Sequence, residues 1–320
     1  MKRFILHTLT ILALAAIIIL ALTWHIASTL SRADFTLPDS VHIITLGPST
    51  TACALDDEYL EGMKNISKHG IYLPQLIPLL PQLLDENKQI DTVYINFGRC
   101  PIFLHTKYRN IPEVETRGSI NYQLRFYYYD FQNTDWKGYA RNPDFYLSLL
   151  TPDFWDLVKA RKPRNLTDYE FGYTNVSYAN LHKPEIDWSI EWYARTTAER
   201  GGNTYSRQWI QDNCAPIDRA ARAAIDICRA RDVTPILFFT PLYQYDRWVA
   251  PAPFREYMAT FPPDILIADY EDFTFPDDTY YGDVHHLNLH GAHYFTTHLA
   301  RHGIRAIPLS QLLTAPSPTN

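Results

Sequence analysis

Short apolar runs alternate with amphipathic stretches along most of the chain. Runs rich in β-branched and aromatic residues, each closed by Gly or Pro, predict buried strands at residues 41–46, 92–97 and 235–239. Weaker runs predict further strands at residues 63–67 and 265–268. The strand pattern therefore recurs from the first third of the chain to the last.

Apolar residues at helical spacing predict helices between and after these strands. They lie at residues 72–84, where prolines should break or shorten the helix, and at 217–228, 253–261 and 289–301, the last with Asn288 as its N-cap. Strands that alternate with helices imply a mainly parallel sheet covered on both faces. We therefore predict an α/β fold with three α/β/α layers.

The N-terminus has a different pattern. Lys2 and Arg3 precede a nearly continuous apolar run over residues 4–24, about the length a helix needs to cross a bilayer. The positive-inside rule then leaves the N-terminus cytoplasmic and residues 31–320 extracytoplasmic, periplasmic or at the cell surface. A cleaved signal peptide is the alternative, but such apolar regions are usually about 7–15 residues long. We expect residues 1–30 to form a cytoplasmic stub and a transmembrane anchor that contacts the lipid bilayer.

Residues 107–202 are rich in Tyr and Trp and have few periodic runs, which indicates an insertion into the α/β domain. Aromatic side chains with a polar group suit a groove for a sugar. Packing of the insertion onto the main body is the alternative, and general burial preferences favour it.

The composition argues against three classes of protein: disordered chains, nucleic-acid binders and disulfide scaffolds. Hydrophobic residues make up 46% and charged residues 20%, which is typical of a folded chain. A net charge of −6 without a dense basic stripe argues against nucleic acid as a partner. With 4 cysteines in 320 residues, the chain is not a disulfide scaffold.

Two short motifs carry candidate chemistry. Ser49 follows the first predicted strand in a Gly-Pro-Ser-Thr turn, and Asp283 and His286 stand just before the last predicted helix. Ligands of such sheets bind beyond the carboxyl ends of the strands, where both motifs should lie. A serine, a histidine and a carboxylate supply the nucleophile, base and orienting group of acyl transfer. Each motif alone is weak, since Ser49 can cap a helix and Asp283 can begin a turn.

Taken together, the two motifs resemble those of the SGNH (GDSL-like) hydrolase superfamily, and more closely its membrane-anchored extracytoplasmic branch. The resemblance covers roughly residues 41–106 and 230–305. It implies a flavodoxin-like three-layer fold and a triad of Ser49, His286 and Asp283. It also assigns Gly70, with its backbone N–H, to the oxyanion site and matches Gly98 to the glycine of the third family block.

Two positions depart from the family pattern. Pro48 replaces the usual aspartate before the serine, and Cys100 replaces the usual asparagine after Gly98. Loss of one oxyanion donor typically lowers the rate ~10²–10³-fold. Asn96, on the preceding strand, should point away from the place of the family's asparagine. A slow enzyme, a specialised transferase and a pseudoenzyme are all compatible with these changes.

The resemblance implies a serine esterase or O-acyltransferase that acts on acyl groups of an extracytoplasmic carbohydrate or cell-envelope glycan. It also implies a partner, a multi-spanning membrane protein that donates acyl groups. The alternatives are a catalytically impaired protein of the same fold that binds a glycan or a membrane partner, and a structural anchor without a ligand.

Other residues offer competing chemistry. His285 is the neighbour of His286 and lies one residue out of the family register. Several histidines of the last helix have helical spacing, but no Cys or acidic cluster joins them, so an amphipathic helix is favoured over a metal site. We expect neither a metal nor a cofactor. Cys53 and Cys100 both follow carboxyl ends of strands that are neighbours in the family's sheet, which allows a disulfide in an oxidising compartment.

Overall fold

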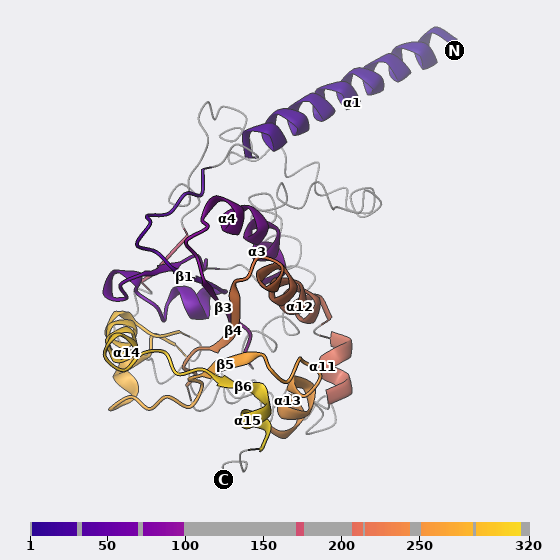
Figure 1. Cartoon of the computed structure of the whole chain (residues 1–320). Helices are drawn as coiled ribbons and strands as arrows, with labels where there is room; N and C mark the ends of the chain where they lie inside the picture. Colours follow the sequence, from indigo (N-terminus) through magenta and orange to yellow (C-terminus); the bar gives the residue numbers. More distant parts are fainter. Residues whose placement is uncertain are drawn as a thin grey trace. The chain divides into compact units, whose positions relative to one another are not determined.

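The computed structural model describes residues 2–30, 34–69, 73–98, 171–175, 207–213, 215–243, 251–283 and 286–314 (Figure 1). The chain divides into two compact units, one of Met1–Phe35 with Glu113–Tyr169 and one of Thr36–Pro112 with Glu170–Asn320. Apart from residues 171–175, the predicted insertion at 107–202 lies outside the described residues.

The first unit contains helix α1 (Lys2–Leu30), which includes the N-terminal apolar run. Large apolar side chains of this helix, among them Phe4, Leu6 and Ile11, are exposed. Within the part of the chain that the structure describes, no helix combines the length and the apolar character that a membrane crossing requires.

The second unit is built on a six-stranded sheet with the order β2-β1-β3-β4-β5-β6. Its strands are β1 (Ile43–Leu46), β2 (Met63–Asn65), β3 (Thr92–Asn96), β4 (Thr234–Phe239), β5 (Leu266–Asp269) and β6 (Ile307–Pro308). All neighbours pair in parallel except β5 and β6, which are antiparallel. The five predicted strands are confirmed with ends shifted by up to two residues, whereas β6 was not predicted. The strand order reverses between β1 and β3, and this switch point is where doubly wound sheets bind ligands.

The helices of this unit are mostly those predicted from apolar spacing. The proline-containing stretch is broken, as expected, into α3 (Leu73–Leu76), the 3₁₀ turn η2 (Ile77–Leu79) and α4 (Leu80–Glu86). The longer helices are α12 (Ala215–Arg229), α13 (Pro251–Met258) and α14 (Leu289–His302). Short elements without a sequence prediction are α2 (Ser49–Ala52), η1 (Asp57–Tyr59), α11 (Arg207–Asn213), η3 (Asp278–Tyr280) and α15 (Leu309–Thr314).

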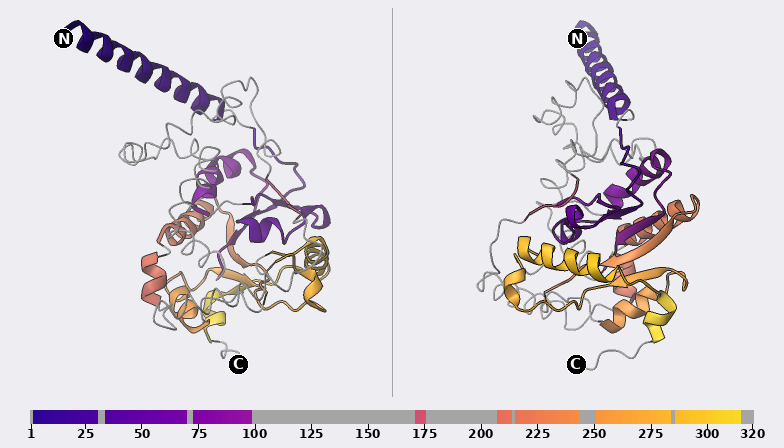
Figure 2. Two further views of the ribbon diagram at one scale, coloured as in Figure 1. Left: turned by 180° about the vertical axis from the view of Figure 1, so that it is seen from behind. Right: turned by 60° about the vertical axis from the view of Figure 1, so that its left-hand side comes forward.

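Helices lie on both sides of the sheet, as a three-layer α/β/α arrangement requires. Figure 1 and the view from behind in Figure 2 place α14 on one side of the sheet and α12 on the other. Phe295 and Leu299 of α14 are buried in one core with Tyr94 and Phe238 from the strands. Because side chains alternate along a strand, the other face is left for α12, which contacts β3 and β4. The structure is thus α/β with a mostly parallel sheet, in agreement with the sequence prediction.

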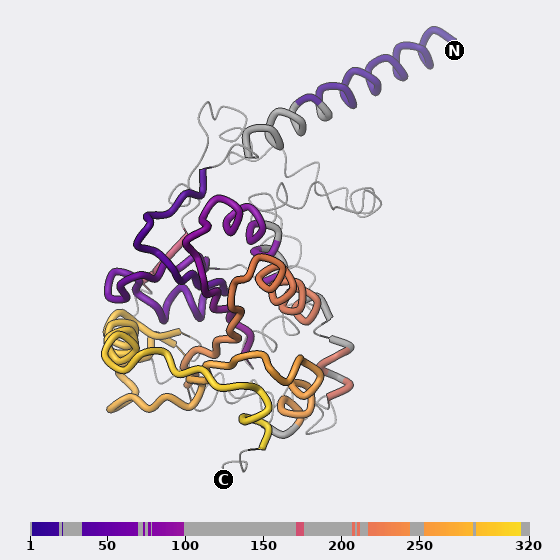
Figure 3. The backbone as a smooth tube through the Cα atoms, in the orientation of Figure 1, coloured from indigo at the N-terminus to yellow at the C-terminus, as the bar shows by residue number. Residues whose placement is uncertain are grey.

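Segments that are distant in sequence meet in this unit, whose backbone is traced in Figure 3. The segment after β1 and the segment before α14 both lie beyond the carboxyl end of the parallel strands, although they are more than two hundred residues apart in sequence. Parallel topology therefore brings the two candidate motifs to one edge of the sheet.

Candidate active site

Ser49 begins α2 directly after the turn that ends β1. Gly47 in this turn leaves room for its neighbours: a Cβ atom there would lie 2.1 Å from Oγ1 of Thr51 and 2.7 Å from Cβ of Asn96. No side chain larger than a hydrogen atom fits this position without displacing β3 or α2. The close approach fixes where the first turn of α2, and with it Ser49, stands against the sheet.

The side chain of Asn96, at the end of β3, contacts this turn through hydrogen bonds. Its amide Nδ2 lies 2.5 Å from Oγ1 of Thr51 and 3.3 Å from the hydroxyl oxygens of Thr50 and Thr240. Asn96 is 1% exposed, so these contacts are shielded from water. The sequence pattern assigned Asn96 only a direction on the strand, whereas the structure shows that it links β3, α2 and the end of β4.

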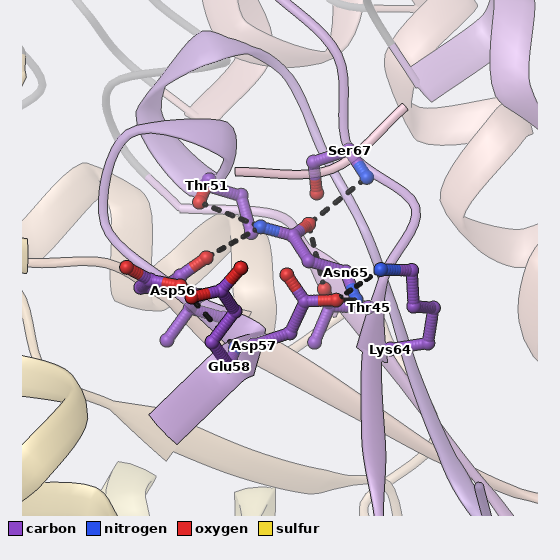
Figure 4. A network of polar contacts seen from close by, with 9 residues as sticks. Thr45, Thr51, Asp56, Asp57, Glu58, Lys64, Asn65 and Ser67 are labelled. Atoms are coloured by element: carbon purple, nitrogen blue, oxygen red, sulfur yellow. Dashed lines mark hydrogen bonds and ion pairs between the residues drawn. The ribbon is translucent and has the colours of Figure 1, made fainter. Parts of the chain in front are cut away.

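A second buried amide ties β2 to the same turn (Figure 4). Asn65 Oδ1 accepts hydrogen bonds from the Thr45 hydroxyl and the Ser67 backbone N–H, both at 3.0 Å. Its Nδ2 donates to the carbonyl oxygen of Leu55 at 2.8 Å and approaches that of Thr51 at 3.5 Å. Asn65 is fully buried. It therefore holds both ends of the segment that carries Ser49.

The other half of the site is a tight turn before α14. Tyr281 and Leu287 form an antiparallel bridge, and the Gly282 N–H donates to the carbonyl oxygen of His286 at 2.9 Å. Asn288 caps α14, as predicted, by accepting from the Gly291 N–H at 3.0 Å, and its Nδ2 donates to the carbonyl oxygen of Thr279 at 2.6 Å. These bonds fix the loop on which Asp283 and His286 stand.

The structure brings Ser49, His286 and Asp283 together as a hydrogen-bonded chain. The Ser49 Oγ atom lies 2.8 Å from Nε2 of His286, and Nδ1 of His286 lies 2.8 and 3.0 Å from the carboxylate oxygens of Asp283. A carboxylate only accepts hydrogen bonds, so Nδ1 carries the proton and Nε2 accepts from the Ser49 hydroxyl. This is the tautomer that a general base next to a serine nucleophile requires.

The side chains of the triad are partly exposed and are flanked by buried residues. The side chains of His286 and Asp283 are 13% and 25% exposed. Ser49 is half-buried, between the buried Pro48 and Thr50.

The described part of the oxyanion side consists of the start of α2. The backbone N–H of Ser49 belongs to the first helical turn, where N–H groups have no acceptor within the helix. Pro48 has no N–H, although its carbonyl oxygen accepts from Thr51 and Ala52. Gly98 is buried, and a Cβ there would lie 2.6 Å from Oε1 of Glu271. Gly70 and Cys100 lie outside the described residues, as does His285.

Two further residues at the site carry chemistry: His69, to which the sequence reading assigned no role, and Cys53, for which it allowed a disulfide. His69 is exposed, and its ring centroid lies 5.6 Å from that of His286. Partial desolvation of its ring by neighbouring atoms, then the nearby His286, lowers the pKa of His69 below its ordinary value. Cys53 is fully buried, and burial, then the charge of Asp283, raises its pKa to about 12. The spacing of Cys53 from Ser49, four residues, was the available signal, because it equals about one helical turn.

Cys53 is a free thiol in the structure. Cys100 lies outside the described residues, so the disulfide that the sequence allowed is not seen.

The histidines of α14 have contacts other than the triad. His293 Nε2 lies 3.0 Å from Oδ2 of the buried Asp56, and the rings of His298 and His302 have centroids 4.6 Å apart. A groove of about 780 Å³ runs over this surface and is lined by Thr279, Tyr280, His290, His293, Tyr294, Thr297, His298, Arg301 and His302. None of these residues belongs to the triad.

Comparison with known proteins gave no match: no protein-family model matches the chain, and neither does any curated protein or any solved structure.

Proposed function

We propose that this chain is a serine esterase or O-acyltransferase of the SGNH type, which acts on acyl groups of an extracytoplasmic carbohydrate or cell-envelope glycan. The observation that carries the proposal is the continuous Ser49–His286–Asp283 hydrogen-bond chain at the switch point of the sheet. Ser49 comes from a segment more than two hundred residues before the turn that carries Asp283 and His286, and the fold by itself does not require the three side chains to align in this order. Acyl transfer does need them in this order.

In the first half of the reaction, Nε2 of His286 accepts the proton of the Ser49 hydroxyl while Oγ attacks the ester carbonyl carbon. Asp283 keeps the ring in the required orientation and stabilises the imidazolium as it forms. The protonated His286 then gives its proton to the leaving sugar oxygen. The products of this half are the free sugar hydroxyl and an acyl group on Ser49.

The second half repeats these steps with a new nucleophile. His286 takes a proton from water, which gives hydrolysis, or from a second sugar hydroxyl, which gives transfer. The carbonyl oxygen becomes negatively charged in both halves, and the N–H of Ser49 points a positive dipole toward it from the start of α2. By resemblance, the backbone N–H of Gly70 supplies a second donor and Gly98 shapes the same side of the site.

The choice of a carbohydrate substrate and an extracytoplasmic location depends on the sequence. Lys2 and Arg3 before the apolar residues 4–24 support an N-terminal anchor with a cytoplasmic end, and the aromatic residues of 107–202 suit sugar rings. A multi-spanning acyl donor in the same membrane is the partner that the resemblance implies. Alkaline extraction of membranes tests the anchor. Protease treatment of cells whose outer layers are opened while the cytoplasmic membrane stays intact tests the location. Release of the protein by alkali, or protection of residues 31–320 from the protease, contradicts this part of the proposal.

A serine-directed fluorophosphonate probe tests the catalytic part. We expect the full-length protein to be labelled and the label to map to Ser49. Ser49→Ala should lose the label, whereas Ser310→Ala, which changes an exposed serine of α15, should keep it.

Well-folded wild-type protein that stays unlabelled overturns the enzyme proposal. That outcome favours the alternative in which the fold binds a glycan or a membrane partner without catalysis. Isothermal titration of the protein with acetylated and deacetylated glycan fragments measures the glycan binding that this alternative predicts.

A further inference from the structure

Three metal-ligating side chains converge beside Ser49. One ligand atom each from Cys53, His69 and His286 lies within 4.8 Å of the other two. They come from three separate segments: the end of α2, the loop after β2 and the turn before α14. Within the described part of the chain, these three residues are the one group of Cys, His or acidic side chains with at least three members close enough to share a metal ion.

The donor set suits zinc. Zn²⁺ prefers thiolate and imidazole ligands in tetrahedral geometry, with Zn–S near 2.3 Å and Zn–N near 2.0–2.1 Å, which places ligand atoms roughly 3.3–3.6 Å apart. A contraction of about 1 Å from the observed limit reaches that spacing. His69 is exposed, so its side chain can move toward the other two ligands.

His286 has the supporting contact that zinc-binding histidines usually have. Its Nδ1 donates to Asp283 at 2.8 Å, which leaves the lone pair of Nε2 directed toward Ser49. Such carboxylate–histidine pairs orient the ring and raise its basicity toward a metal. The same feature that prepares His286 as a base therefore prepares it as a ligand.

We propose that Cys53, His69 and His286 bind one Zn²⁺ ion, which switches off Ser49 by occupying Nε2 of its base. The binding capacity stands on the ligand geometry, whereas the inhibitory consequence rests on the proposed function. Water takes the fourth position.

The step balances without a redox change. The S–H bond of Cys53 breaks, an S–Zn bond forms and the proton goes to solvent. The Nε2 lone pair of His286 exchanges the hydrogen bond from Ser49 for a bond to zinc. The Ser49 hydroxyl keeps its proton and is no longer activated, so zinc binding and nucleophilic attack exclude one another.

The pair His298 and His302 on α14 is the rival zinc site, since an i, i+4 histidine pair can chelate one ion. It contributes two ligands rather than three, and its surroundings are aromatic: Phe273 lies with its ring centroid 4.9 Å from that of His298. His298→Gln removes this pair without touching the Ser49 site, which makes it the matched control.

Zinc binding to purified, metal-free, full-length protein is measured by competition with a chromophoric chelator. We expect one Zn²⁺ per chain, with affinity weakened at least about tenfold by Cys53→Ala and by His69→Gln but unchanged by His298→Gln. His69 is exposed, so its variant folds even if the buried Cys53→Ala variant does not. No zinc binding, or binding that only His298→Gln weakens, overturns the proposal.

Fluorophosphonate labelling with and without zinc tests the inhibition separately. Zinc should suppress labelling of the wild type, a chelator should restore it, and His69→Gln should be labelled equally in both conditions at the same zinc concentration. Zinc that binds at Cys53 and His69 but leaves labelling unchanged overturns the inhibitory role. If the metal-free protein is not labelled at all, the proposed function fails, while the chelator competition still decides whether zinc binds.

Discussion

The carboxylate of Asp283 holds His286 through both its ring and its backbone. Oδ1 lies 2.8 Å from the backbone N–H nitrogen of His286 and 3.0 Å from ring Nδ1, while Oδ2 lies 2.8 Å from Nδ1. The ring can therefore neither flip nor rotate away from Ser49 without breaking bonds to a single side chain. This contact sets the tautomer on which the proposed chemistry depends.

Asp283→Asn should keep the fold and lose most of the reactivity of Ser49. An amide in this place can donate to Nδ1, which moves the ring proton to Nε2 and leaves no base for the serine. The expected drop is about 10⁴-fold in turnover of an activated ester, the size seen when a triad carboxylate is replaced in this way. Initial rates with p-nitrophenyl acetate provide the measurement.

Asp264→Asn is the matched control for that substitution. Asp264 is an exposed carboxylate that pairs with Arg229 at 2.9 Å, remote from the triad segments in sequence. It should leave the rate unchanged. A similar loss of rate in both variants, or an unchanged rate in Asp283→Asn, would refute the assigned role of Asp283.

Asn96→Ala should destabilise the protein and misplace Ser49. It removes the buried amide that donates to Thr51 and Thr50 and leaves their hydroxyls without this donor. We expect a loss of roughly 1–3 kcal/mol in the free energy of unfolding, measured by urea denaturation, together with slower fluorophosphonate labelling. Asn175→Ala, at an exposed asparagine, serves as control and should change neither quantity. Unchanged stability in Asn96→Ala contradicts the structural role.

Asn65→Ala should be destabilising for a different reason, because this amide bonds backbone groups of Leu55 and Ser67 as well as the Thr45 hydroxyl. Loss of its bonds leaves the Leu55 carbonyl oxygen and the Ser67 N–H without their partner in a fully buried place. We expect at least about 2 kcal/mol of lost stability. Faster hydrogen exchange over residues 49–56, compared with the wild type, is the more local measurement. Exchange that speeds up only elsewhere argues against the link to α2.

His298 should make stability depend on pH. Burial, then the nearby His302, lowers the pKa of His298 below its ordinary 6.5. The unfolded chain therefore takes up a proton at a higher pH than the folded chain, so stability is present above about pH 6.5 and is lost as the pH falls through the lower folded-state pKa. His298→Gln should reduce the loss of unfolding free energy between pH 7.5 and 5.5. The difference should be less than about 1 kcal/mol because the ring is partly exposed, and urea denaturation at the two pH values measures it. His290→Gln, on the same helix, should keep the wild-type slope, and identical slopes in all three proteins rule out the effect.

Much of the fold follows from local pattern. The strand β4 and the helix α14 could be read from apolar runs, spacing and the Asn288 cap, because burial requires side chains of one kind to recur with the period of the element. Strand β6 could not be read in this way. It has two residues, Ile307 and Pro308, and forms because β5 offers an edge to which it can pair.

Some residues of the candidate site could likewise be predicted from the sequence, and others could not. Residue type and the rule that parallel strands share a carboxyl edge brought Ser49, Asp283 and His286 together as candidates, and the resemblance to the SGNH superfamily assigned them their roles. Asn65 and Asn96 were not nominated, because a buried amide is recognised by the hydroxyl, N–H and carbonyl groups around it, and those come from segments that are remote in sequence.

Sequence pattern thus predicted the five parallel strands and the longer helices and, together with the family resemblance, the three residues of the candidate triad. The packing of the segments sets the 2.8 Å between Ser49 Oγ and His286 Nε2 and brings Cys53 and His69 beside them. The physical reason is that periodicity reports which face of an element is buried, whereas distances between side chains depend on how the packed segments meet. Gly47 is an example: its missing side chain lets α2 pack closely against Asn96 of β3.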